Sequence, residues 1–234
     1  MYIRGPRSCF SLTKLILKSR NYNKVEYDGV TQLVSNHFKS WSTEDHVNRP
    51  IFQCALSELN QKPAIIIETG TSAWGTDSTR IWDSYIRKFG GSFITIDIRP
   101  EPSRNLIAQL SKKSACYVGD SVEILNNLSE LSADLYYLDS HDLDLNNPFP
   151  SASHGLSEFV AIEKSLKPGA LILIDDTPSE SRLESMPKLP AGSKTFIEKY
   201  GVNPGKGAFI LQYLEKRIKY EILFHDYAIL IRVL

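Results

Sequence analysis

The sequence predicts an α/β fold: a doubly wound, mostly parallel sheet with helices on both faces and an antiparallel hairpin strand at the C-terminal end. Three observations support this prediction. From residue 64 onward, short apolar segments alternate with helix-length segments, which is typical of a parallel sheet. Small residues follow the first apolar segment, and acids end the second, fourth and fifth. The last two apolar segments are separated by His225 and Asp226, a connection that joins antiparallel neighbours and is too short for a parallel crossover.

The boundaries of the elements follow from apolar runs, Gly and Pro. Five parallel strands are expected over residues 64–69, 92–98, 115–118, 133–138 and 170–174. Helices are expected over residues 77–89, 103–112, from Ser121 onward, 155–166, 193–200 and 206–217. Loops are expected over residues 140–153 and 177–192, because both are polar and contain Pro. The closing hairpin, over residues 219–224 and 227–233, is expected to add one antiparallel strand.

The segment before the first strand, residues 1–62, is expected to lie outside the main domain of residues 63–234. It begins with a basic arm over residues 1–24, which contains six Lys or Arg residues and no acid. An ordinary N-terminal arm explains this composition, and a targeting peptide shows it too. Helices follow, because apolar residues recur at helical spacing at Val30, Leu33, Val34 and Phe38 and again at Phe52, Ala55, Leu56 and Leu59. We expect this segment to act as a cap or as a homodimer contact.

Composition limits the classes of function. Lys plus Arg and Asp plus Glu number 27 each among the 234 residues, so no basic field favours nucleic acid or an anionic membrane. No apolar run approaches the ~20 residues of a membrane helix. The three cysteines are widely spaced and odd in number, which predicts neither a disulfide framework nor a zinc cluster and favours a reducing, cytoplasmic location.

A nucleoside site is predicted where the first two strands end. Gly70, Thr71 and Ser72 follow the first strand, and small residues there let a ligand approach the backbone and the N-terminus of the next helix. Asp97 ends the second strand, the place at which an acid takes the hydroxyls of a ribose.

Taken together, these marks resemble the Rossmann-like class I S-adenosylmethionine-dependent methyltransferases over roughly residues 60–234. The resemblance rests on Glu68-Thr69-Gly70, Asp97, Gly119-Asp120-Ser121, Asp139 and the closing hairpin. It implies that S-adenosylmethionine is the cofactor, with its methionine part above Gly70, its ribose on Asp97 and its adenine beside Asp120 and Ser121. The full set that it assigns to the cofactor is Glu68, Gly70, Thr71, Ser72, Asp97, Asp120, Ser121 and Asp139. The sequence departs from the family in one respect: four residues separate Gly70 from Gly75, where the family pattern is commonly shorter.

The acids that end the fourth and fifth strands predict a metal site. Asp139 follows one strand and Asp175-Asp176 the other, and the carboxyl ends of parallel neighbours meet at one edge of a sheet. Three carboxylates there repel one another unless a positive charge lies between them, and a hard divalent cation such as Mg²⁺ prefers oxygen ligands. The arrangement resembles the metal-dependent O-methyltransferases of the catechol and antibiotic-sugar types. That resemblance implies a small hydroxylated acceptor: a sugar, a polyol or a phenol.

The catalytic base is not marked as clearly. The related families place Lys or His three residues after the first metal acid, where this sequence has Asp142. The candidates are therefore His141, with His154 in reserve, since imidazole titrates near neutral pH. Asp142 is expected to face the acceptor.

Other interpretations remain open from the sequence. Asp120 would also serve as a helix cap, and Asp175-Asp176 as turn residues before Thr177-Pro178. Trp74 and Trp82 are expected to serve in packing. A nicotinamide-dependent oxidoreductase shares the small-residue loop and the acid after the second strand, although G-x-G-x-x-G is absent. A non-catalytic protein or a hydroxylase on the same fold is a further alternative.

Overall fold

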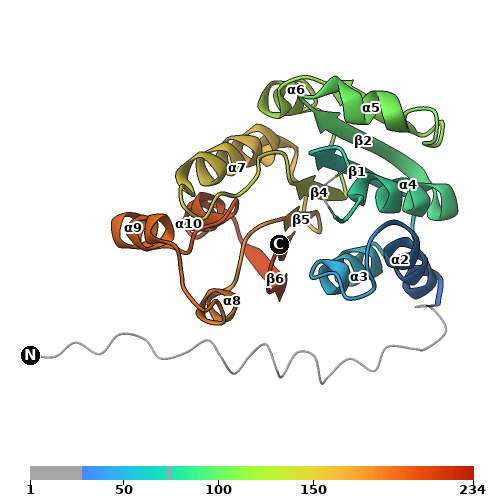
Figure 1. Ribbon diagram of the computed structural model, residues 1–234. Helices are drawn as coiled ribbons and strands as arrows, with labels where there is room; N and C mark the ends of the chain where they lie inside the picture. The colour runs from blue at the N-terminus through green and yellow to red at the C-terminus, as the bar shows by residue number, and fades with distance from the viewer. Residues whose placement is uncertain (1–27, 73–74) are drawn as a thin grey trace, which may run out of the picture.

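The computed structural model describes residues 28–72 and 75–234, so the basic arm and Trp74 lie outside the described residues. The described residues form a seven-stranded sheet in the order β3-β2-β1-β4-β5-β7-β6. Figure 1 labels β2, β1, β4, β5 and β6, which follow one another in this order from the top of the view downward. The strands are β1 (Ala64–Thr69), β2 (Gly91–Asp97), β3 (Ser114–Val118), β4 (Leu135–Leu138), β5 (Leu171–Ile174), β6 (Tyr220–His225) and β7 (Ile229–Val233). Strands β1 to β5 pair in parallel, and β7 runs antiparallel to β5 and β6. The predicted mixed topology is confirmed.

Helices fill the connections and differ from the expected ones mainly at their ends. They are α2 (Asp28–Trp41), α3 (Arg49–Glu58), α4 (Ser78–Phe89), α5 (Pro100–Leu106), α6 (Ser121–Asn127), α7 (Phe149–Ile162), α8 (Glu180–Glu184), α9 (Ala191–Tyr200) and α10 (Ala208–Leu214). Within the described part of the chain, no helix has the length and apolarity needed to cross a bilayer.

Two loop predictions are wrong in part, and both errors have a local cause. Helix α7 begins inside the expected loop of residues 140–153, with a proline in its first turn. Proline is tolerated there because an N–H in the first turn has no partner within the helix, and because the fixed φ of proline suits a helix. Helix α8 interrupts the expected loop of residues 177–192, because the Ser179 side chain accepts a hydrogen bond from the Arg182 N–H and caps it. The final hairpin has three residues between its strands, 226–228, where two were expected.

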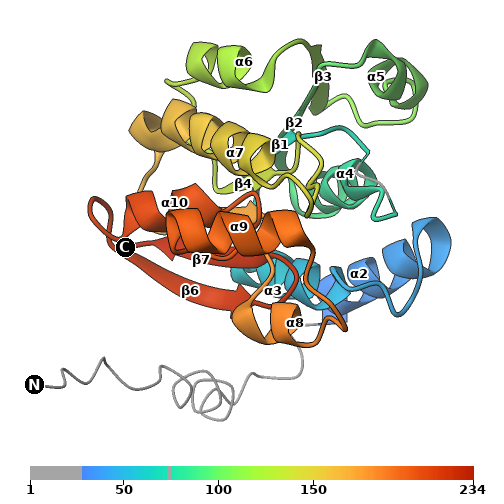
Figure 2. The same cartoon turned by 60° about the vertical axis from the view of Figure 1, so that its left-hand side comes forward.

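The sheet is covered on both faces, as Figure 2 shows. Helices α2, α3 and α4 pack on one face, against a cluster that includes Ile66, Tyr137 and Leu173. Helices α6, α7 and α10 pack on the other face, against the residues that alternate with these. Because side chains alternate along a strand, a strand buried on both faces is apolar throughout, which is why its sequence reads as a continuous apolar run.

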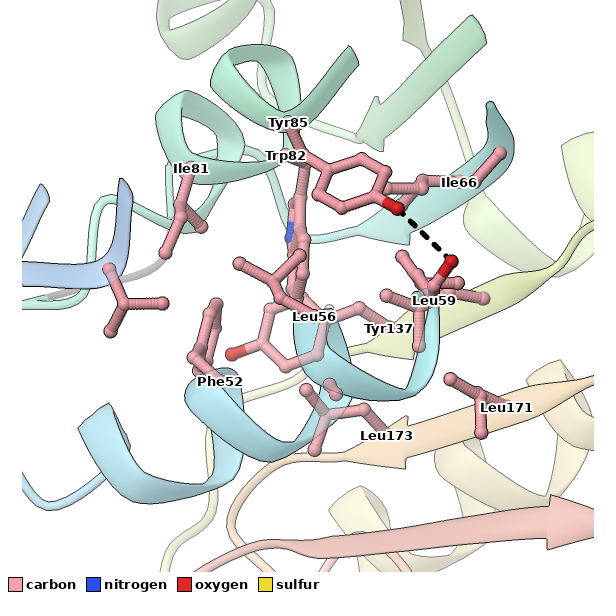
Figure 3. Packing of buried hydrophobic residues seen from close by; sticks show 14 of the residues in the cluster. Phe52, Leu56, Leu59, Ile66, Ile81, Trp82, Tyr85, Tyr137, Leu171 and Leu173 are labelled. Carbon is pink, nitrogen blue, oxygen red and sulfur yellow. Dashed lines mark hydrogen bonds between the residues drawn. The ribbon is translucent and has the colours of Figure 1, made fainter. Parts of the chain in front are cut away.

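An aromatic cluster joins the N-terminal helices to the sheet (Figure 3). The Phe52 ring on α3 stacks on Trp82 of α4 with a centroid distance of 4.7 Å. The same ring meets Tyr137 of β4 edge-on at 5.4 Å. All three side chains are fully buried. Helix α3 therefore belongs to the same core as the sheet, and a boundary at residue 62 does not separate two cores.

Removal of the Phe52 ring tests this shared core. We expect Phe52→Ala to lower the free energy of unfolding by about 3–5 kcal/mol, because it leaves a cavity between α3, α4 and β4. Urea unfolding followed by circular dichroism measures the change. Val160→Ala, at an exposed site on α7, serves as the control and should change stability by less than about 0.5 kcal/mol. A loss below about 1 kcal/mol for Phe52→Ala would contradict a shared core.

Candidate functional site

The turn after β1 brings three strand ends together at Gly70. This residue has φ +84°, and a Cβ atom on it would lie 2.2 Å from the main-chain oxygen of Asp139. The Gly70 N–H donates a hydrogen bond of 2.8 Å to the Ile96 carbonyl of β2. A side chain at position 70 would therefore collide with the end of β4 and would also strain the turn.

A cavity opens beside Gly70 at the carboxyl edge of the sheet. The residues that line it are Gly70, Ile96, Asp97, Ile98, Asp120, Ser121, Ser140, His141 and His154. Six of these nine residues are ones the sequence analysis selected for cofactor binding or catalysis, so residues far apart in the chain meet where a ligand would bind. Glu68, Thr71, Ser72, Asp139 and Asp142 were also selected but do not line this cavity. Thr71 and Ser72 line a neighbouring depression with Arg80 and Arg99.

Asp97 forms one wall of the cavity and also holds the Gly70 turn. Its carboxylate accepts hydrogen bonds from the Thr71 N–H at 3.0 Å and from the Arg99 N–H at 2.7 Å. The Arg99 guanidinium pairs with both carboxylate oxygens, at 3.0 and 2.9 Å. The Arg99 side chain is 64% exposed and that of Asp97 is 4% exposed, so a ligand that binds Asp97 would share or replace the contact with Arg99.

Glu68 lies beneath the turn, away from the cavity. Its carboxyl is fully buried and accepts hydrogen bonds from Ser78, Thr79 and Thr95 at 2.5 to 2.7 Å. Burial raises the pKa of Glu68 to about 7 in spite of these three donors. The sequence assigned Glu68 to the cofactor, but in the structure it supports the turn and the start of α4 from below.

Asp120, Ser121 and His154 border the cavity from α6 and α7. The Asp120 side chain accepts a hydrogen bond of 3.0 Å from the Glu123 N–H, so the capping role is present alongside the position at the cavity. Ser121 Oγ lies 3.2 Å from His154 Nε2, and this nitrogen lies 3.6 Å from the buried carboxylate of Glu158. The contact with Glu158 raises the pKa of His154.

The other two catalytic candidates lie on the loop after β4. The His141 ring lies at the cavity wall, with its centroid 5.6 Å from that of His154. Its Nδ1 is 3.0 Å from the Asp142 carbonyl oxygen. The Asp142 side chain is exposed to solvent. The two histidines therefore lie near each other at the cavity wall, whereas Asp142 does not line the cavity.

The three predicted metal acids meet next to this cavity. Oxygen atoms of Asp139, Asp175 and Asp176 all lie within 4.8 Å of one another. Asp176 adopts φ +43°, a left-handed conformation that is uncommon for a residue with a side chain. The sequence prediction that these acids converge is confirmed, and their use as metal ligands stays a prediction.

A lysine that the sequence analysis did not select already lies in the acidic cluster. The Lys206 ammonium pairs with Asp139, and it lies 3.0 Å from Asp176. Burial alone lowers the pKa of Lys206, but Asp139, Asp176 and Asp175 outweigh it and the net pKa lies above its ordinary value. Burial also raises the pKa of both Asp139 and Asp175. With Lys206 in this place, the side chains do not fit a divalent metal.

Neutral side chains complete the cluster. The Tyr137 hydroxyl lies 3.0 Å from Asp139 and 2.9 Å from Asp175. Tyr227 donates to Asp176, and Asn48 donates to Asp175 at 3.0 Å. Because a phenol has one proton, Tyr137 can donate fully to only one of the two acids at a time.

These supporting residues carried little signal in the sequence. Lys206 lies between Gly205 and Gly207, a pattern that indicates close backbone packing, but the local periodicity placed it at the start of a helix. Asn48 precedes α3, in a segment expected to act as a cap or as a homodimer contact. Tyr137 appeared as one apolar residue within a buried strand.

Comparison with known proteins gives the fold a name. No protein-family model and no curated protein matches the sequence. Among solved structures, MycE methyltransferase from the mycinamycin biosynthetic pathway, in complex with Mg, SAH and mycinamycin VI, aligns with a TM-score of 0.53 and 16% identity. The alignment covers 87% of this chain, which spans about half of MycE (53%). The SAH-bound methyltransferase PaMTH1 from Podospora anserina aligns with a TM-score of 0.53 and 17% identity over 99% of this chain and 100% of its own.

A structure from Staphylococcus aureus, provisionally assigned as a caffeoyl-CoA O-methyltransferase, aligns with a TM-score of 0.55 and 15% identity. The alignment covers 88% of this chain and 98% of that one. The fold is that of the class I methyltransferases. At these identities the likeness concerns the fold, and the argument for an activity depends on the cavity and on the residues around it.

The buried carboxyl of Glu68 predicts a pH-dependent stability. Its pKa is about 4.5 in an unfolded chain and about 7 when folded, so the folded state holds the proton more tightly. Protonated Glu68 therefore adds to the free energy of unfolding. This contribution, roughly 3 kcal/mol, is fully present below pH 4.5 and is lost as the pH rises to 7.

Glu68→Gln keeps the shape and removes this titration. Urea unfolding of both proteins across that pH range should show the wild type losing stability relative to the variant as the pH rises. Other titrating groups cancel in this comparison because they are common to both proteins. Parallel pH profiles would contradict the raised pKa.

Proposed function

We propose that this chain is an S-adenosylmethionine-dependent O-methyltransferase that acts on a hydroxyl of a small molecule, such as a sugar, a polyol or a phenol. The observation that supports it most is the single cavity at Gly70, which gathers Asp97, Asp120 and Ser121 at the carboxyl edge of β1, β2 and β3. A small-residue turn beside an acid suits a nucleoside. The methyltransferase neighbours with bound SAH support the choice of that nucleoside.

The proposed reaction is a direct transfer of a methyl group. The acceptor oxygen attacks the methyl carbon, an O–C bond forms, and the C–S bond breaks. The sulfonium becomes the neutral thioether of S-adenosylhomocysteine, and the acceptor proton passes to a base. Rate would come largely from holding the oxygen and the methyl group in line.

Among the base candidates, His141 suits the role better than His154. Both line the cavity, but the contact with Glu158 raises the pKa of His154 and favours its protonated form. A protonated imidazole cannot accept a proton. We therefore assign the base to His141 and a cavity-lining role to His154.

The metal requirement expected from the sequence is a separate question. The MycE neighbour was solved with Mg, but the three converging acids of this chain enclose Lys206. No step of the proposed reaction is therefore routed through a metal ion. A cytoplasmic location and a homodimer remain expectations from the sequence.

Titration of the cofactor tests the proposal directly. We expect isothermal titration to detect micromolar binding of S-adenosylmethionine and of S-adenosylhomocysteine. Asp97→Asn should weaken both by about 10- to 100-fold, because the charged hydrogen bonds to the ribose hydroxyls are lost. Glu130→Gln, which removes one charge at an exposed position, should leave the affinity unchanged. No binding of either nucleoside, together with binding of NADH, would replace this proposal with the oxidoreductase alternative.

The base assignment has its own test. With a methylatable acceptor found by screening hydroxylated compounds against S-adenosylmethionine, His141→Ala should lower kcat by about 10²- to 10⁴-fold. The affinity for S-adenosylhomocysteine should stay the same, since His141 is assigned to the proton and not to the cofactor. A His141→Ala variant that keeps full kcat, beside an inactive His154→Ala variant, would transfer the role to His154.

A further inference from the structure

The position of Lys206 is set by its backbone as well as by its charge. The Lys206 N–H donates a hydrogen bond of 3.0 Å to the main-chain oxygen of Asp176. The Gly207 N–H donates one of 2.9 Å to Thr177 Oγ1. The segment that carries the lysine is therefore bonded to the two residues that follow Asp175.

Three glycines allow this close approach. A Cβ atom on Gly205 would lie 2.7 Å from the Asp176 carbonyl oxygen, and one on Gly207 would lie 2.8 Å from the Thr177 side chain. On the opposite side, a Cβ atom on Gly155 of α7 would lie 2.4 Å from the Lys206 carbonyl oxygen. Each distance is too short for a real side chain, so the lysine backbone is held on both sides. A lysine on a freely moving surface loop would have no such surroundings.

The ammonium and its neighbours use the oxygens that a metal would need. Lys206 contacts Asp139 Oδ1 and Asp176 Oδ2, and Tyr137 contacts Asp139 Oδ2 and Asp175 Oδ2. The remaining two oxygens, Asp175 Oδ1 and Asp176 Oδ1, accept from Asn48 and Tyr227. Every carboxylate oxygen of the cluster thus has a partner within the protein.

A divalent ion could not be added to this arrangement. Mg²⁺ demands oxygen ligands at about 2.0–2.1 Å in a nearly octahedral shell. Lys206 lies among the same three acids, and its side chain is 4% exposed. A metal ion could bind there only if the ammonium moved out of this tightly packed site. The Coulomb repulsion between an ammonium and a metal ion at this separation opposes binding of both together.

We propose that Lys206 is the resident cation of the Asp139–Asp175–Asp176 cluster and excludes a divalent metal from it. The chain thereby carries a tethered ammonium among these three acids, whereas the MycE neighbour was solved in complex with Mg. For catalysis this inference rests on the proposed function: methyl transfer would proceed at an unchanged rate in the presence of a chelator. For metal binding it stands independently of any activity.

Binding of Mn²⁺, followed by electron paramagnetic resonance of the free ion, tests the proposal on the intact chain. The wild type should show no saturable binding up to about 1 mM. Lys206→Met keeps most of the length of the side chain and removes the charge, so it should bind Mn²⁺ at least about 100-fold more tightly than the wild type. Its melting temperature should rise by several degrees with Mn²⁺, because the ion binds the folded state.

Two controls test whether the gain of Mn²⁺ binding depends on losing the positive charge at position 206, and not on losing a lysine elsewhere. Lys206→Arg keeps a cation in the cluster and should not acquire the metal site. Lys194→Met removes an exposed lysine of α9 and should not acquire it either. A Lys206→Met variant that folds but binds no Mn²⁺ would overturn the proposal, because the lysine would not be what excludes the metal.

The wild type alone decides the matter if Lys206→Met does not fold. Saturable Mn²⁺ binding below about 1 mM that disappears in Asp175→Asn would overturn the proposal, since a metal would then displace the lysine. Absence of such binding supports it. Failure of the proposed function would appear separately, as absent binding of S-adenosylmethionine, and would leave the Mn²⁺ result valid.

Discussion

Three carboxyl groups lie close together at the carboxyl edge of this sheet, and such a cluster of acids requires a positive charge beside it. Strands β4 and β5 are paired in register, with Leu138 beside Ile174, so the acids that follow them cannot move apart. Isolated carboxylates in such a place would carry a large desolvation penalty. Lys206 supplies the charge, and its segment packs against residues 176–177 to do so.

The hydrophobic core and the polar cluster share side chains, so packing in the core also positions polar groups of the cluster. The Tyr137 ring packs against Phe52 and Trp82, while its hydroxyl contacts Asp139 and Asp175. Asn48, at the start of the helix that carries Phe52, donates to Asp175. Packing of α3 therefore positions hydrogen-bond donors in the cluster. The N-terminal helices therefore pack in the same core as the sheet, and α3 helps to position the acidic cluster.

The sequence predicted what depends on local pattern or on parallel topology. Apolar runs located the strands, helical spacing located the buried residues of α2 and α3, and the ends of parallel strands brought Asp139 and Asp175 together. The start of α7 and the whole of α8 were missed, because a proline and a serine cap outweighed an otherwise polar, loop-like composition.

Lys206 was missed for a different reason. The three acids predicted a positive charge between them, and this charge was assigned to a metal ion because hard divalent cations prefer oxygen ligands. The lysine reaches the cluster through tertiary contacts of Gly205 and Gly207 with residues that precede them by many positions. Local periodicity contains no information about such a contact.

Asp139 connects the two halves of the site. Its side chain contacts Lys206 and Tyr137, so it affects the cavity beside Gly70 through its main chain, which packs on that glycine. A tethered ammonium balances charge without depending on the concentration of any ion. It cannot, however, accept a proton while charged, nor bind the acceptor oxygen as an added ligand in the way an open metal site does. In the proposed reaction, removal of the acceptor proton would therefore fall to another group at the cavity, and the histidines on its wall are the side chains whose chemistry suits that task.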